Sequence, residues 1–113
     1  DELPEALCQL EHLRALDVSF NELHSLPEGL SRLSAMQQLI LHHNCLEALP
    51  ESLSLLSKVT TLDVGFNLIS TLPALKMKRL SLLNLEHNRL AVLPATIGNL
   101  AELSHLRLAE NEL

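Results

Sequence analysis

The 113-residue chain has no tryptophan, no tyrosine and only two phenylalanines, whereas leucine fills 31 positions. A globular core of this size usually takes much of its volume from aromatic side chains. A core that repeats one branched side chain at every level does not need them. Apolar residues make up 47% of the chain, too many for a disordered segment, and their runs are too short for a membrane span. The composition therefore favours a folded, leucine-filled repeat structure.

Cysteine is scarce as well, and one sign of charge prevails. Cys8 and Cys45 fall at non-equivalent places, and the chain has no Asn-x-Ser/Thr glycosylation acceptor. Both features are typical of a reducing compartment, so we expect a cytoplasmic protein. The net charge of −6 comes from scattered acidic residues. It disfavours nucleic-acid binding, which needs a clustered basic surface.

The dominant pattern is a fixed period. The frame L-x-x-L-x-L-x-x-N-x-L occurs five times, with valine, isoleucine or methionine in place of some leucines. A period of this length predicts stacked repeats. A side-chain amide both donates and accepts, so it can bond the backbones of adjacent coils. The asparagines are therefore predicted to form a structural ladder and not a binding site. Separated by 23, 23, 21 and 23 residues, they are Asn21, Asn44, Asn67, Asn88 and Asn111.

Proline keeps the same register and extends the frame with L-x-x-L-P-x-x-L-x-x-L. The alternation in the first half of the unit predicts a strand. The three-residue leucine spacing in the second half predicts a 3₁₀ or short helical turn, whose first position tolerates proline. We expect one domain. It comprises the tail of a preceding repeat at 1–12, full repeats at 13–35, 36–58, 59–79 and 80–102, and a partial repeat at 103–113.

Neither end of the sequence carries the polar capping segment that stacked repeats normally need. The sequence is therefore expected to be a segment of a longer protein. Its apolar ends would favour end-to-end self-association when the segment is expressed alone.

On these motifs the whole chain resembles the leucine-rich repeat superfamily. Its L-P-x-x-L half is similar to that of intracellular Ras-pathway scaffolds, Scribble-type polarity proteins and death-domain adaptors. The resemblance implies an α/β fold, a right-handed solenoid with a concave parallel sheet and convex 3₁₀ or short helices and turns. It also implies a protein-interaction or scaffold module in signalling. The alternative that it implies is a regulatory region of a larger kinase, GTPase or ubiquitin ligase, with catalysis elsewhere.

In this register the side chains between the inward leucines face the concave surface, where a protein or peptide partner is expected to bind. Ile40 and Leu82 are expected to be exposed apolar anchors that lie close together. Four acids accompany one arginine on this face, which predicts a partner with a basic surface; the acids are Asp17, Asp63, Glu86 and Glu110. The candidate partner-binding residues are Asp17, Phe20, Ile40, His42, His43, Asp63, Phe66, Leu82, Asn84, Glu86, His87 and Arg107.

The position before the ladder asparagine alternates between phenylalanine and histidine in the first four repeats. Successive rungs of a sheet are about 4.8 Å apart, so neighbouring rings are placed to stack. The column is either a packing ladder along the rim of the sheet or part of a binding strip. Its members are Phe20, His43, Phe66 and His87.

The repeat at 59–79 is two residues shorter than the others and breaks the second half of the frame. We expect an extended or tighter convex segment there. The segment contains Lys76, Lys78 and Arg79, three of the eight basic residues of the chain. They form either a solvated loop or a small contact patch for an acidic partner.

Six histidines raise the question of a metal site. His43 and His87 lie two rungs apart, roughly 10 Å, which zinc–ligand distances of about 2 Å do not bridge. Asp63 with His42 is the nearest approach to a catalytic pair, but no positioned nucleophile, oxyanion site or phosphate loop accompanies it. No metal, cofactor or catalytic residue is predicted, and a non-enzymatic binding function is expected.

Overall fold

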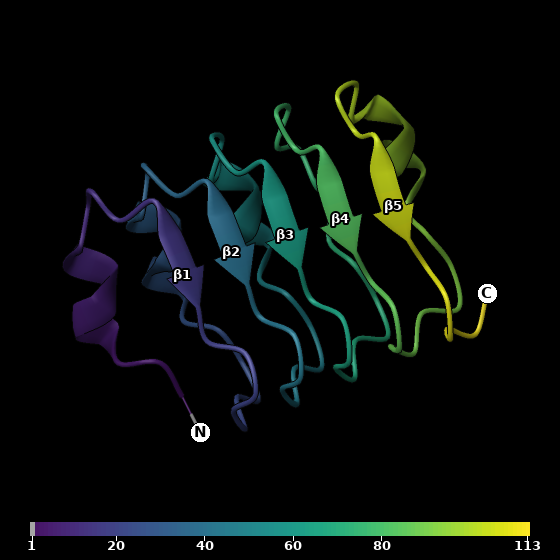
Figure 1. Ribbon diagram of the computed structural model, residues 1–113, viewed down its shortest axis with the longest axis horizontal. Coiled ribbons are helices and arrows are strands. Elements are labelled where there is room, and N and C mark those ends of the chain that lie inside the picture. The colour runs from purple at the N-terminus through teal and green to yellow at the C-terminus, as the bar shows by residue number, and fades with distance from the viewer. Residues whose placement is uncertain (1) are drawn as a thin grey trace.

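The computed structural model describes residues 2–113, and five short parallel strands form its single sheet. Equivalent residues of successive repeats stand side by side, because each strand pairs with the next in the register of the frame. Figure 1 shows the strands in chain order across the sheet. They are β1 (Ala15–Asp17), β2 (Gln38–Ile40), β3 (Thr61–Asp63), β4 (Leu82–Asn84) and β5 (His105–Arg107).

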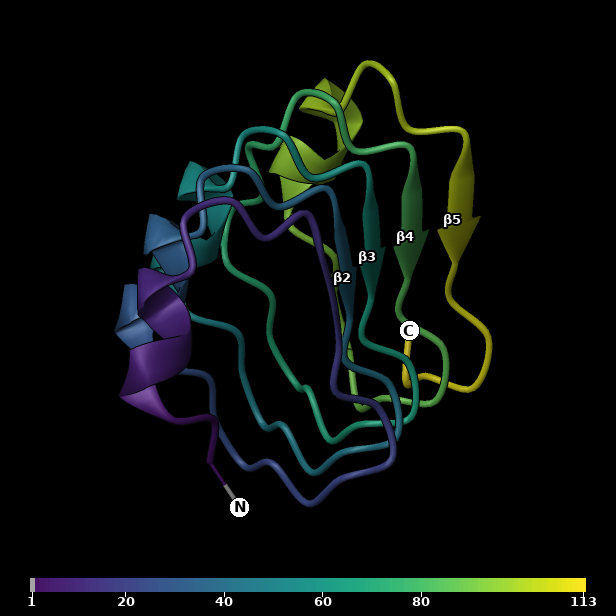
Figure 2. The ribbon, with the colours of Figure 1, turned by 60° about the vertical axis from the view of Figure 1, so that its left-hand side comes forward.

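Four 3₁₀ helices form the opposite, convex layer (Figure 2). Each begins directly after a proline whose φ lies between −64° and −68°, because proline presets this angle and needs no hydrogen-bond acceptor there. The predicted solenoid of parallel strands and 3₁₀ turns is confirmed. No helix within residues 2–113 is long and apolar enough to cross a membrane. The helices are η1 (Glu5–Gln9), η2 (Glu28–Arg32), η3 (Glu51–Leu55) and η4 (Ala95–Asn99).

The leucines of the frame fill the space between the two layers. In the second repeat Leu39, Leu41 and Leu46 have no solvent exposure at all, and burial of each such side chain stabilises the fold by roughly 1.5–3 kcal/mol. The equivalent Leu16 of β1 and Leu106 of β5 are only partly buried. Each edge strand has a neighbouring strand on one side only within the described range, so the inner repeats form the best-packed part of the core.

Four of the five asparagines of the frame connect adjacent coils, as predicted, whereas Asn21 bonds only the carbonyls of its own turn. The Asn67 Oδ1 accepts the N–H of Leu46 at 2.9 Å, from the preceding repeat. Its Nδ2 lies 3.0 Å from the carbonyl oxygens of Leu41 and Val64, one in each of two neighbouring coils. The side chain thus satisfies backbone groups that the turn leaves without strand partners. The same pattern recurs at Asn44, Asn88 and Asn111.

The short repeat departs from the others on the convex side, where residues 70–77 have no helix. Leu75 and Met77 are buried, whereas Lys76 and Lys78 are exposed. This alternation is that of an extended chain, and the extended segment expected here is confirmed. Because this repeat is two residues shorter, its buried apolar residues are two positions apart and not three, as they would be in a 3₁₀ turn.

Candidate functional site

The concave face of the sheet is open to solvent. The outer residues of each strand are exposed or half-buried, and the central leucines of β2, β3 and β4 are fully buried on the other side. No element of residues 2–113 lies over this face (Figure 2). The columns expected from the register are present. The column at the third strand position consists of Asp17, Ile40, Asp63, Asn84 and Arg107.

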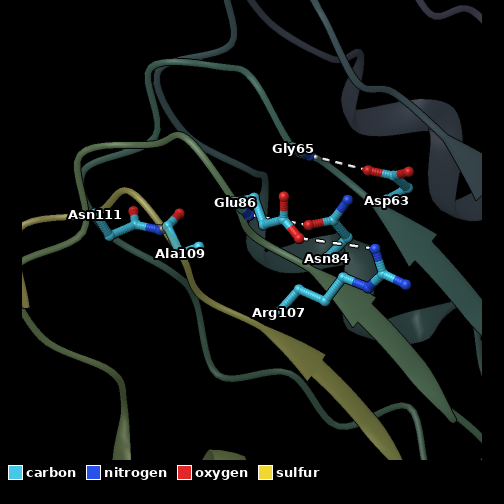
Figure 3. A network of polar contacts seen from close by, with 7 residues as sticks. All are labelled: Asp63, Gly65, Asn84, Glu86, Arg107, Ala109 and Asn111. Carbon is cyan, nitrogen blue, oxygen red and sulfur yellow. Dashed lines mark hydrogen bonds and ion pairs between the residues drawn. The ribbon is translucent and has the colours of Figure 1, made fainter.

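Three members of this column also organise the backbone, a role that sequence reasoning missed. In each case the side-chain oxygen accepts the backbone N–H two residues further on, where the chain leaves the strand. Figure 3 shows this bond at Asp63 and at Asn84. An asparagine makes this bond as well as an aspartate, so the turn requires an oxygen but no charge. The bonds are Ser19 N–H to Asp17 Oδ1 at 3.0 Å, Gly65 N–H to Asp63 Oδ1 at 3.1 Å and Glu86 N–H to Asn84 Oδ1 at 3.0 Å.

Asp17 has a second partner in the same turn. The Ser19 hydroxyl donates to Asp17 Oδ1 at 2.6 Å. This bond and the Ser19 backbone N–H hold the pKa of the Asp17 carboxyl below its usual value, with a smaller contribution from the charge of His42. Hydrogen bonds to the charged form favour ionisation, so Asp17 presents a carboxylate to solvent.

The one arginine of the face is paired. Arg107 Nη1 lies 3.8 Å from Glu86 Oε1, between strand β5 and the end of β4 (Figure 3). An exposed pair of this kind contributes about 0–1 kcal/mol to stability, but it offsets one positive charge against one negative charge. Asp17, Asp63 and Glu110 remain without a basic partner in the described chain. The acidic bias expected for this face is therefore present.

The expected apolar anchors do not form a patch, and this part of the interpretation was wrong. Ile40 and Leu82 are half-buried and lie on β2 and β4. The pairing register puts β3 between them: Ile40 stands beside Asp63, and Leu82 stands beside Thr61. The sequence placed them on one face but in different columns, so polar side chains of β3 separate them.

A continuous stack of rings borders the sheet where the strands end. Successive ring centroids lie 4.2, 4.2 and 4.1 Å apart, and the ring planes are within 18° of parallel. The predicted stacking along the rim is confirmed. All four residues have φ between 53° and 57°, a left-handed conformation that costs a side chain with a Cβ roughly 1–2 kcal/mol. In chain order the stack is Phe20, His43, Phe66 and His87.

Two consecutive histidines of this region bond to each other. The Nδ1 atoms of His42 and His43 lie 2.8 Å apart, so one ring donates and the other accepts. Asp63 Oδ1 accepts a hydrogen bond from the Gly65 backbone N–H. The Phe66 ring lies between those of His43 and His87 and keeps them apart. Within residues 2–113 no three histidine, cysteine or acidic side chains converge as metal ligands would. The arrangement offers polar and aromatic contact surface.

A solenoid of short parallel strands, convex 3₁₀ helices and an asparagine ladder defines a class of repeat proteins that bind through an open sheet. Residues 11–69 match the leucine-rich repeat family, and so do residues 79–100. The first match alone covers more than half of the chain, which therefore belongs to the leucine-rich repeat family. The segment between the two matches coincides with the part of the short repeat that has no helix. No curated protein sequence matches the chain.

Several solved structures share the fold. A leucine-rich repeat protein of Leptospira interrogans is 31% identical with a TM-score of 0.96, over 98% of this chain and 29% of that chain. A TDR receptor is 35% identical with a TM-score of 0.89, over 97% of this chain and 20% of that chain. An internalin of Listeria monocytogenes is 25% identical with a TM-score of 0.86, over 97% of this chain and 32% of that chain. The chain thus spans at most about a third of these proteins.

Proposed function

We propose that this chain is a non-enzymatic interaction module that binds a protein or peptide partner on its concave face, as part of an intracellular signalling scaffold. The supporting observation is a five-stranded face that no described element covers, although its side chains are held in fixed columns. An uncovered sheet face of this kind is typical of repeat proteins that bind partners. Fold alone does not define function, so the class of partner is inferred from the charge and the apolar surface of the side chains in these columns.

The columns favour a partner with lysine or arginine on its surface. Asp17, Asp63 and Glu110 are acidic and have no basic partner in the described chain. Complementary charge contributes mainly to the rate of encounter and to specificity. The aromatic stack along the rim adds apolar ring surface, with Phe20 70% exposed and Phe66 39% exposed. Such rings suit contact with the stems of long basic side chains.

The test uses the intact protein with Asp17 and Asp63 both replaced by asparagine. Asn84 shows that asparagine preserves the turn bond, so this variant removes charge and keeps the fold. The matched control replaces Glu22 and Glu47, two exposed acids outside the sheet, by glutamine. Partners captured by proximity labelling are compared by quantitative mass spectrometry. The proposal expects basic partners to be lost from the first variant only; equal retention by both would move the site off this face.

The proposed intracellular location rests on the two free thiols, Cys8 and Cys45, and on the missing glycosylation acceptor. Cell fractionation of the tagged intact protein tests it, and recovery in the secreted fraction would refute it. We also propose that the 113-residue segment associates end to end through its two open edge strands. A monomer at high concentration in light scattering would contradict this part.

A further inference from the structure

The missing helix of the short repeat opens a groove on the convex side. η1 packs on η2 and η2 packs on η3, but residues 74–79 separate η3 from η4. In Figure 2 a segment that forms no helix separates the teal ribbon of η3 from the yellow-green ribbon of η4. Two hollows, of about 230 and 350 Å³, flank this segment and share Lys76 and Lys78 in their walls. We call this region the convex groove. It lies away from the concave face and is independent of the function proposed for that face.

The convex groove collects positive charge on an otherwise acidic chain. Half of the eight basic residues line it, although the net charge is −6. All four side chains are exposed, and none forms an ion pair with another residue of the described range. Clustered charge without local partners raises the local concentration of ligands of opposite sign. The four residues are Lys58, Lys76, Lys78 and Arg79.

The remaining walls are suited to a chain that carries both polar and apolar side chains. Leu75 and Leu100 give the smaller hollow an apolar wall, and Asn99 contributes an amide. The Thr96 hydroxyl beside them is buried and has no hydrogen-bond partner within residues 2–113. At the η3 side Leu55 is 69% exposed in a further hollow, whose wall contains both Lys76 and Glu51.

We propose that the convex groove binds an extended acidic segment of a partner protein, one with carboxylates at alternate positions. Lys76 and Lys78 are two residues apart on an extended backbone, so their side chains leave the same face with an offset of roughly 7 Å. Carboxylates at alternate positions of an extended peptide repeat at the same distance. A single phosphate would need cations that converge on one point. A nucleic acid would extend beyond the groove and meet the acidic remainder of the chain.

The experiment measures binding of a fluorescein-labelled peptide with glutamate at every second position, by fluorescence anisotropy at physiological ionic strength. The test variant combines Lys76→Glu with Lys78→Glu. A matched control combines Arg32→Glu with Arg89→Glu, which changes the net charge equally at two other exposed positions. Circular dichroism checks folding, and Lys76→Gln with Lys78→Gln serves if charge reversal disturbs it. We expect roughly five- to thirtyfold weaker binding in the test variant and little change in the control.

Five outcomes would overturn the proposal. The first is no binding by the unaltered protein, and the second is an equal loss in both charge-reversed variants. The third is equal binding of a peptide whose glutamates are grouped in one block, because it removes the spacing argument. The fourth is a dimer in light scattering that only the groove variant abolishes, since a second copy of this chain would then be the occupant. Stronger groove-dependent binding of a short single-stranded oligonucleotide would likewise replace the peptide.

Discussion

Replacement of Asn67 by alanine should destabilise the domain strongly, because its amide forms hydrogen bonds with the backbones of two adjacent coils at once. The side chain is 5% exposed. Its loss leaves the buried Leu46 N–H without its acceptor, at a cost of about 1–3 kcal/mol. It also removes two donated bonds, to the Leu41 and Val64 carbonyls, each worth about 0.5–1.5 kcal/mol. The expected loss is roughly 2–6 kcal/mol, a large part of the 5–15 kcal/mol typical of a domain.

The assay is urea unfolding followed by circular dichroism, since the chain has no tryptophan or tyrosine to report by fluorescence. Asn21→Ala is the matched control. Asn21 is exposed, and its amide bonds the Val18 and Ser19 carbonyls of its own turn, so its loss should cost less than about 1 kcal/mol. Similar losses at Asn67 and Asn21 would refute the ladder argument.

Further predictions concern strain, charge and thiol access. Glu110→Gly should stabilise the domain by roughly 0.5–1 kcal/mol, because glycine removes left-handed strain at φ 59°. Phe66→Gly should not, because it also removes two stacked contacts worth about 0.5–1.5 kcal/mol each; urea unfolding of both variants compares them. The Asp17 pKa is lowered in the folded state, so its stabilising contribution is present above the unfolded pKa and is lost on acidification. Asp17→Asn should therefore approach the unaltered protein in stability below about pH 4. Cys8 is buried and burial raises its thiol pKa, so iodoacetamide mapped by mass spectrometry should modify Cys45 first; equal rates would contradict this burial.

Much of the fold could be predicted because each repeat position has one physical task. The leucines at alternate positions must face inward, and the asparagine at the turn must supply both a donor and an acceptor. The two-residue deletion at 74–79 was also visible in the sequence, since it replaces one periodicity with another. These features are local, and stacking copies them from coil to coil.

The candidate site was harder to predict, because its properties depend on neighbours. The frame shows that Asp17 and Asp63 face outward, but not that each accepts a backbone N–H two residues on. Asn84 at the equivalent position was a signal that could have revealed this turn. Ile40 and Leu82 are separated because they lie in different columns on strands that flank β3. The repeat frame predicts which face each residue occupies, but that alone does not make the two residues neighbours. The left-handed φ of the ring column has no sequence signature here, since phenylalanine is uncommon in that conformation.

The ring column shows why the fold was easier to predict than the candidate site. A left-handed turn recurs before every ladder asparagine, including at Glu110, where no ring is present. The conformation therefore belongs to the repeat, and the asparagine bonds on either side hold it. Because the turn is fixed by the ladder, the residue in it is free to vary and always emerges at the rim of the concave face. The aromatic stack therefore depends on which side chains occupy this position, whereas the turn that presents them is common to all five repeats.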